Sequence, residues 1–371
     1  MATVIVVVLS GCLSESAELP KTKNATLNEL LQSAPSSVVH LNNITVDTLF
    51  ATEKHTLANS RTSSVSPTAR LGRVTGLVKE DDTLYVADSQ QGCIWAIDRQ
   101  GNLCRKIGRS GRGPGEFGSF IGLKKNSHHL YTLDVSNARI QIFDSNFNLQ
   151  TTFSHVIHAG GVSGYKSISI TDSLLYMPAS GRADSLITAY RVTPPFDSLT
   201  SFYPRLIPRG MQPGPYNSYQ IDSNKQGEVV VSNTGLPYIF FFNSNQQLKL
   251  VIYVKFPEKD IPGNPSVEPI DKVARNMSEA ISVKRLIGKL YLADDRSLYF
   301  TNSGKLYHLT YNAEENEYRT QSAKFFTFRN PQKHEENPNG INPTNMTVDE
   351  DNNTVYLGSI FNEFIYQFNL H

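Results

Sequence analysis

The chain has 371 residues, of which 39% are hydrophobic and 19% are charged. The charged share lies below the roughly 25% typical of soluble domains, which excludes a disordered, highly charged polymer. The 35 Lys and Arg residues nearly balance the 34 Asp and Glu residues, and the net charge of +1 excludes a strong field that would attract nucleic acid. We therefore expect no nucleic-acid partner, and length alone leaves open several domains or one repetitive domain.

The first residues predict an export signal and a lipid anchor. Val4–Leu9 is a short apolar run, far below the ~20 residues needed to span a bilayer, and a Ser-Gly-Cys string that ends at Cys12 follows it. The string resembles the bacterial lipobox, although the usual basic residues ahead of the run are absent. We expect residues 1–11 to be the remnant of a signal peptide, Cys12 to carry the lipid, and residues 12–36 to form a flexible tether. A chance cysteine is the alternative.

An anchored chain of this kind would lie in the cell envelope of a bacterium. We expect the outer membrane as its site, with the folded body in the periplasm or at the cell surface. No other window approaches the length and apolarity of a membrane span, so the lipid is the only membrane contact that the sequence predicts.

Two further cysteines, Cys93 and Cys104, flank a predicted turn between two strands. Neighbouring antiparallel strands bring such residues together only in some registers, and an extracytoplasmic site permits a disulfide. The sequence leaves open a Cys93–Cys104 disulfide and two free thiols.

A repeat of about fifty residues organises the rest of the chain. Leu84–Asp88 (LYVAD) matches Leu130–Asp134 (LYTLD) at an offset of 46 positions, and Gly111–Phe117 (GRGPGEF) matches Gly210–Tyr216 at an offset of 99. Six copies fit between about residue 70 and residue 371. Within a copy, runs rich in Val, Ile, Leu, Tyr and Phe alternate with clusters of Asn, Asp, Gly and Ser, which is typical of strands joined by hairpins.

Four antiparallel strands at this period define a propeller blade, so the sequence predicts an all-β, six-bladed β-propeller. The sixth copy ends on its third strand, which would leave an unpaired edge. We expect the N-terminal segment 37–49 to complete the last blade and close the ring. The predicted organisation is a single monomeric domain over residues 37–371, with blades from about residue 70 to residue 371.

The string Gly108–Phe117 (GRSGRGPGEF), with the LYVAD run before it, resembles NHL-type six-bladed propellers. The chain from about residue 37 to residue 371 is similar to the lipobox-bearing six-bladed propellers of Gram-negative bacteria, including the TolB-like group. The resemblance implies the fold and no particular activity. A phosphate-loop interpretation of the glycines is rejected, because no Lys-Ser/Thr pair and helix follow them.

Loops on one face of such a propeller surround the central channel and carry polar side chains. Arginines there suit bidentate contacts to carboxylates or sulfates, which favours a glycan, a peptide or an envelope protein as the partner. A solvated loop surface without a ligand, or a structural scaffold, is an alternative. The expected ligand-binding residues are Arg109, Arg112, Glu116, Asn137, Arg139, Asp184, Arg209 and Asn233.

We favour a binding module, with no resident cofactor or metal. The alternative function is a calcium-dependent hydrolase, lactonase or lyase that works in the channel, as in related propellers. No catalytic residue is predicted, because no Gly-x-Ser-x-Gly elbow and no metal-binding histidine spacing occurs. Side chains at the end of the second strand are secondary candidates for oxygen ligands, and capping of the following turn is the favoured interpretation of them: Asp88, Asp134, Asn233 and Asn302.

Overall fold

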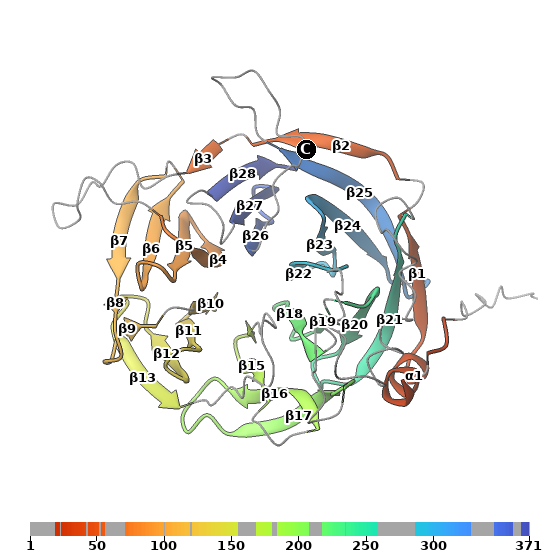
Figure 1. The fold of residues 1–371 in the computed structure, drawn as a ribbon, viewed down its shortest axis with the longest axis horizontal. Helices are drawn as coiled ribbons and strands as arrows, with labels where there is room; N and C mark the ends of the chain where they lie inside the picture. The colour runs from red at the N-terminus through yellow and green to blue at the C-terminus, as the bar shows by residue number, and fades with distance from the viewer. Residues whose placement is uncertain are drawn as a thin grey trace, which may run out of the picture.

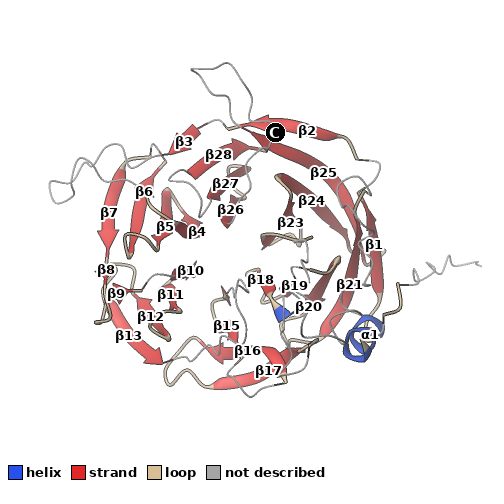
Figure 2. Cartoon of the chain, in the orientation of Figure 1, coloured by secondary structure: helices blue, strands red, loops and turns tan. Residues whose placement is uncertain are grey.

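Six sheets are arranged around a central axis as the blades of a propeller, and helix α1 (Ala25–Gln32) lies outside the ring (Figures 1 and 2). The computed structural model describes residues 19–22, 24–41, 44–51, 53–55, 71–99, 101–118, 121–154, 168–179, 184–207, 217–233, 235–257, 286–327, 345–358 and 365–370. Within these residues no helix has the length and apolarity that a membrane span requires. The all-β, six-bladed prediction is confirmed.

Each blade uses one copy of the repeat, with its first strand beside the channel and its fourth at the rim (Figure 1). The first three blades consist of β4 (Val74–Glu80), β5 (Thr83–Asp88), β6 (Cys93–Asp98) and β7 (Leu103–Ile107); β10 (Ile121–Lys125), β11 (Leu130–Asp134), β12 (Arg139–Phe143) and β13 (Leu149–Ser154); and β14 (Ser169–Ile170), β15 (Leu174–Pro178), β16 (Ser185–Arg191) and β17 (Ser198–Pro204). The next three consist of β18 (Tyr219–Ser223), β19 (Val229–Asn233), β20 (Tyr238–Phe242) and β21 (Leu248–Lys255); β22 (Leu290–Leu292), β23 (Leu298–Asn302), β24 (Lys305–Asn312) and β25 (Glu317–Thr327); and β26 (Asn345–Asp349), β27 (Thr354–Gly358) and β28 (Ile365–Asn369).

The core lies between the blades, because each sheet packs against a neighbour on both faces. The middle strands β19 (VVVSN) and β20 (YIFFF) are therefore buried at every position, whereas the rim strand β13 (LQTTFS) alternates between half-buried and exposed side chains. The register shifts between the third and fourth strands of the first five blades, and such bulges increase the local twist.

An N-terminal strand closes the ring, but it is not the expected one. β3 (Glu53–His55) pairs antiparallel with β28 and is the fourth strand of the last blade. The expected segment 37–49 instead contributes β1 (Ser36–His40), which runs parallel to β21, and β2 (Val46–Phe50), which runs parallel to β25 (Figure 1). The chain passes two open rim edges before it reaches the last blade, and it pairs with the backbone groups of each.

The expected tether also contains ordered structure. Helix α1 (Ala25–Gln32) begins at Asn24, whose side chain accepts a hydrogen bond from the Leu27 N–H at 2.8 Å and donates one to the Leu206 carbonyl at 2.8 Å. Its apolar face is buried in the core cluster of the third and fourth blades. The prediction of a flexible tether is thus wrong for this helix, while Cys12 and the rest of residues 1–18 lie outside the described residues.

Neither Cys93 nor Cys104 forms a disulfide, which decides between the two alternatives left open by the sequence. β6 and β7 pair Ile94 with Ile107 and Ala96 with Arg105, so Cys104 lies near the opposite end of the ladder from Cys93. Cys93 is buried and Cys104 is exposed. Burial raises the pKa of the Cys93 thiol to about 12, so this side chain behaves as a small hydrophobic residue.

Candidate functional site

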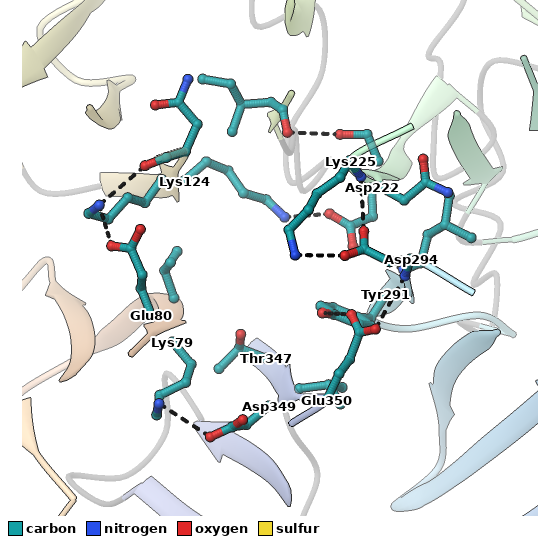
Figure 3. Close-up of a pocket in the computed structure, with 18 of the residues that line it drawn as sticks. Lys79, Glu80, Lys124, Asp222, Lys225, Tyr291, Asp294, Thr347, Asp349 and Glu350 are labelled. Carbon is teal, nitrogen blue, oxygen red and sulfur yellow. Dashed lines mark hydrogen bonds and ion pairs between the residues drawn. The ribbon is translucent and has the colours of Figure 1, made fainter. Parts of the chain in front are cut away.

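A cavity of about 840 Å³ opens at one end of the central channel (Figure 3). Its walls are the last residues of the first strand in each blade and the hairpins that follow these strands, together with Arg99 from the turn between β6 and β7. All six blades contribute, so the cavity exists only in the closed ring. We call the residues that line it the charged mouth.

The charged mouth carries more acidic than basic side chains. The nine carboxylates are those of Glu80, Asp81, Asp82, Asp172, Asp222, Asp294, Asp349, Glu350 and Asp351. The five basic side chains are those of Lys79, Arg99, Lys124, Lys125 and Lys225. A concave site lined by one excess sign of charge focuses its field on the opening, which favours entry of cations over anions.

Polar contacts bridge every junction between blades around the charged mouth. In order from the seam between last and first blades, these contacts are Lys79 Nζ–Asp349 Oδ2 (3.2 Å), Lys125 Nζ–Glu80 Oε2, Ser127 Oγ–Asp172 Oδ1 (3.1 Å), Ser169 Oγ–Ser223 Oγ (2.8 Å), Lys225 Nζ–Asp294 Oδ2 (2.7 Å) and Tyr291 Oη–Glu350 Oε1 (2.7 Å). Figure 3 shows the side chains converging on one space. The contacts hold the polar groups of the wall in fixed positions.

One ion pair does not follow this neighbour-to-neighbour pattern. Lys124, on the second blade, places its Nζ 2.5 Å from Asp222 Oδ1 on the fourth blade (Figure 3). The pair passes the third blade, whose first strand β14 has only two residues. Asp222 is also held by the Ser169 hydroxyl at 3.3 Å and by the Leu292 N–H at 3.0 Å.

Glu350 is the carboxyl group of the charged mouth with the clearest electrostatic perturbation. Partial desolvation raises its pKa above the ordinary value, and hydrogen bonds from the Tyr291 hydroxyl and the Asp294 N–H oppose that shift. The same neighbourhood raises the pKa of Lys225, mainly through its hydrogen bond to Asp294.

Five of the eight residues expected to bind a ligand meet at the junction of the first two blades, at the outer rim. They surround the loop between β8 (Arg109–Ser110) and β9 (Glu116–Phe117), a short parallel ribbon. Arg109 pairs with Glu116 at 2.8 Å, and Arg139 donates hydrogen bonds to the carbonyls of Arg112 and Glu116 at 2.7 and 2.8 Å.

Asn137 donates a hydrogen bond to the Gly111 carbonyl of the same loop, at 2.9 Å. The polar groups of this set thus shape the loop, and they lie at the opposite end of the first strands from the charged mouth. The exposed Asp184 is on the third blade, and Arg209 lies outside the described residues. Asn233 is buried in the fourth blade, where it accepts a hydrogen bond from the Tyr203 hydroxyl. Ligand binding by these residues remains a prediction.

The secondary metal candidates hold loops in place. Asp88 accepts hydrogen bonds from the N–H groups of Gly72 and Gln91 at 2.7 and 3.0 Å, so it ties the entry of its blade to the turn after β5. Asp134 makes the same pair of contacts with the N–H groups of Gly118 and Asn137. The turn-capping interpretation is confirmed for these two aspartates. Asn302 donates to the Leu286 carbonyl at 2.6 Å, and Asn233 has the contact given above.

The sequence reasoning missed the charged mouth, because it treated the hairpin residues only as turn formers. A usable signal was present: ionisable residues end the first strand in most copies, as in Lys79-Glu80, Lys124-Lys125, Asp222 and Asp349-Glu350. Charge at the end of a strand that lies beside the channel indicates a polar channel wall.

Fold, repeat and cavity together define a six-bladed β-propeller with a polar site on its axis. The chain belongs to the DUF5128 family, described as 6-bladed beta-propeller, whose family model matches residues 66–355. No curated protein matches the sequence.

Solved structures share the fold at low sequence identity. A Bacteroides fragilis protein for which export is predicted has a TM-score of 0.53 at 12% identity, over 90% of this chain and 98% of that one. A Bacteroides thetaiotaomicron protein of unknown function has a TM-score of 0.51 at 9% identity, over 88% and 75%. The WD40 repeats of RRP9 have a TM-score of 0.51 at 10% identity, over 88% and 100%. At these identities the likeness concerns the fold alone.

Proposed function

We propose that this protein is a cell-envelope binding module that takes a polar ligand into the charged mouth. The observation that carries the proposal is the cavity of about 840 Å³, whose ionisable lining is held by contacts across all six blade junctions. A preorganised wall lowers the entropic cost of binding, because its side chains are already ordered before the ligand arrives. The volume lies within the roughly 300–1,000 Å³ of small-molecule sites.

The chemistry of the wall favours a glycan or a peptide over a lipid. Carboxylates, ammonium groups and hydroxyls make directional hydrogen bonds, and a lipid chain would leave them unpaired on desolvation. An envelope protein could present a glycan or a peptide segment on a loop that enters the mouth. Five of the eight binding residues inferred from the sequence meet on a separate surface, where hydrogen bonds and an ion pair connect them to the loop between β8 and β9.

The envelope location is part of the proposal and is supported by the apolar run and the Ser-Gly-Cys string at Cys12. Lipidation at Cys12 would anchor the propeller to a membrane. Labelling with radioactive palmitate in a bacterial host tests this step. The wild-type chain is expected to take up label and to fractionate with membranes, and Cys12→Ser is expected to do neither.

No specific observation favours the enzymatic alternative. Within the described parts of the chain, no three His, Cys, Asp or Glu residues are placed to hold a metal ion together. The proposal therefore names no catalytic residue, and calcium is included as an arm of the binding test. Calcium-dependent turnover of an ester or lactone would contradict the binding-module proposal and show that the protein is an enzyme.

The test is a calorimetric screen of oligosaccharides and short peptides, with and without Ca²⁺, on wild type and Ser127→Trp. Ser127 is exposed and lines the cavity, so the indole narrows the opening without entering the core. Ser145→Trp is the matched control, because Ser145 is an exposed turn residue of the same blade outside the cavity. We expect a ligand that loses at least tenfold in affinity on Ser127→Trp only. A ligand that responds equally to both substitutions would place binding elsewhere.

A further inference from the structure

Two hydrogen bonds that involve no lysine hold the carboxylate of Asp222 in position. Its side chain is only 4% exposed, and it accepts hydrogen bonds from the Leu292 N–H and the Ser169 hydroxyl. These contacts come from the fifth and third blades and do not involve a lysine. The remaining open side of the carboxylate faces the cavity. A cation is required there, because a buried ionised group without a partner is costly in free energy.

The cation now in that position is the ammonium of Lys124. Its side chain is 29% exposed, against 5% for Lys79 and 8% for Lys125, the other two lysines that point inward from the first two blades. Lys79 and Lys125 lie between neighbouring blades, whereas Lys124 reaches past the third blade. A flexible four-carbon chain attached at one end can leave such a position, and another ammonium can take it.

The charge balance of the mouth favours that exchange. All five basic side chains of the lining are paired with carboxylates, and these pairs leave Asp81, Asp172, Glu350 and Asp351 without a basic partner among the lining residues. An entering cation therefore meets an excess of negative charge around the opening before it reaches Asp222. An entering anion meets no unpaired cation among these residues.

We infer that the charged mouth binds a ligand with a primary alkylammonium group, and that this group replaces the Lys124 ammonium on Asp222. The inference rests on the proposed function and names the chemistry of its ligand. The same ammonium is offered by a lysine side chain of a peptide and by a free polyamine. Lys124 is then an internal competitor, which the ligand must displace and which keeps the Asp222 carboxylate neutralised while the cavity is empty.

Calorimetry with two probes tests the inference on the full chain: spermidine, and an acetylated, amidated tri-lysine peptide. We expect at least one of them to bind, and the tighter one identifies the source of the ammonium. Lys124→Gln removes the competitor and is expected to bind about tenfold more tightly, because the fraction of competent sites rises. Asp222→Asn is expected to bind at least tenfold more weakly.

Asp294→Asn is the matched control for Asp222→Asn, since Asp294 is a carboxylate of the same mouth paired with the exposed Lys225. Asp294→Asn is expected to change affinity by less than about threefold. Non-specific attraction by the negative charge of the mouth would instead weaken binding equally in both variants. Should Asp222→Asn fail to fold, Lys124→Gln still decides, because unchanged or weaker binding by that variant overturns the exchange.

The other outcomes separate this inference from the proposed function. Equal losses in Asp222→Asn and Asp294→Asn would show diffuse attraction and overturn the inference. A neutral oligosaccharide that binds and is blocked by Ser127→Trp, with no binding of either amine, also overturns it and leaves the proposed function intact. If Ser127→Trp weakens the binding of no probe, both the inference and the proposed function are overturned.

Discussion

Lys79 and Asp349 form a buried ion pair across the seam of the ring, where the first blade meets the last. Lys79 Nζ lies 3.2 Å from Asp349 Oδ2, and the two side chains are 5% and 8% exposed. Lys79 also donates to the Asp81 carbonyl, and Asp349 accepts from the backbone and side chain of Asn352. The seam is thus closed twice, by these contacts at the channel and by β3 at the rim.

Removal of the Lys79 ammonium is expected to destabilise the propeller strongly. Lys79→Met leaves the Asp349 charge buried with only amide partners, and breaking one side of a buried pair costs about 3–5 kcal/mol. Urea unfolding measures the loss. Lys324→Met is the control, since its partner Asp47 is 61% exposed and such surface pairs contribute about 0–1 kcal/mol. Equal losses in the two variants would show that burial of the seam pair has no energetic consequence.

The N-terminal strands are expected to be required for a monomeric ring. Deletion of residues 1–55 removes β3, β2, β1 and α1, and it exposes the edges of β28, β25 and β21 together with the core surface under α1. Unpaired edges recruit other chains, so we expect a lower melting temperature and oligomers in light scattering. Deletion of residues 1–18 alone leaves all four elements and should change neither. A monomer of unchanged stability after the longer deletion would contradict this role.

The repeat made the fold predictable, since hairpin signals and apolar runs such as LYVAD recur with the same spacing and require no knowledge of distant contacts. The closing strand was not predictable in the same way. Segment 37–49 is as strand-like as a closing strand should be, and its pairing with β21 and β25 depends on the path of the chain around the rim. Glu53–His55 is too short to give a signal of its own.

The charged mouth depends on contacts between distant copies, which no local pattern specifies. Lys124 and Asp222 are 98 positions apart, and their contact passes the third blade, whose first strand β14 has only two residues. The absence of a Cys93–Cys104 disulfide has a different, local cause: β6 and β7 pair Ile94 with Ile107, which places Cys104 near the other end of the ladder from Cys93. The Gly108–Phe117 string, by contrast, has arginines that suggest a binding site, but Arg109 pairs with Glu116 of the same loop, and the Arg112 carbonyl accepts a hydrogen bond from Arg139.

Two glycines of the string Gly108–Phe117 are expected to differ in their tolerance of a side chain. Gly108 has a φ of +73°, and a Cβ there would lie 2.4 Å from the Phe117 ring and 2.6 Å from the Gly115 carbonyl. Gly115 has the same φ of +73°, but a Cβ there meets nothing within 4 Å. Gly115→Ala should therefore cost only the roughly 1–2 kcal/mol of a left-handed residue. Gly108→Ala should cost clearly more in urea unfolding, and equal costs would refute the close approach of Phe117.

Glu350 and Glu116 are expected to affect the pH dependence of stability with opposite signs. Desolvation in the folded protein raises the pKa of Glu350. The contribution of the Glu350 carboxyl group to stability is therefore fully present below its pKa in the unfolded chain, about 4.5, and is lost as the pH rises through its pKa in the folded protein. Glu350→Gln keeps an acceptor for the Tyr291 hydroxyl and removes the charge. We expect this variant to be more stable than wild type at pH 7 and equal to it below about pH 4, when Glu350 is protonated in both states.

Glu116 provides the matched comparison. The Gly113 N–H and the Arg109 guanidinium lower its pKa, so its contribution is present above the unfolded value and is lost as pH falls through the folded pKa. Glu116→Gln should therefore be less stable than wild type at pH 7, and the difference should disappear in acid. Melting temperatures of the three proteins between pH 3 and pH 8 measure both effects. Destabilisation at pH 7 by both substitutions would show that desolvation does not dominate at Glu350.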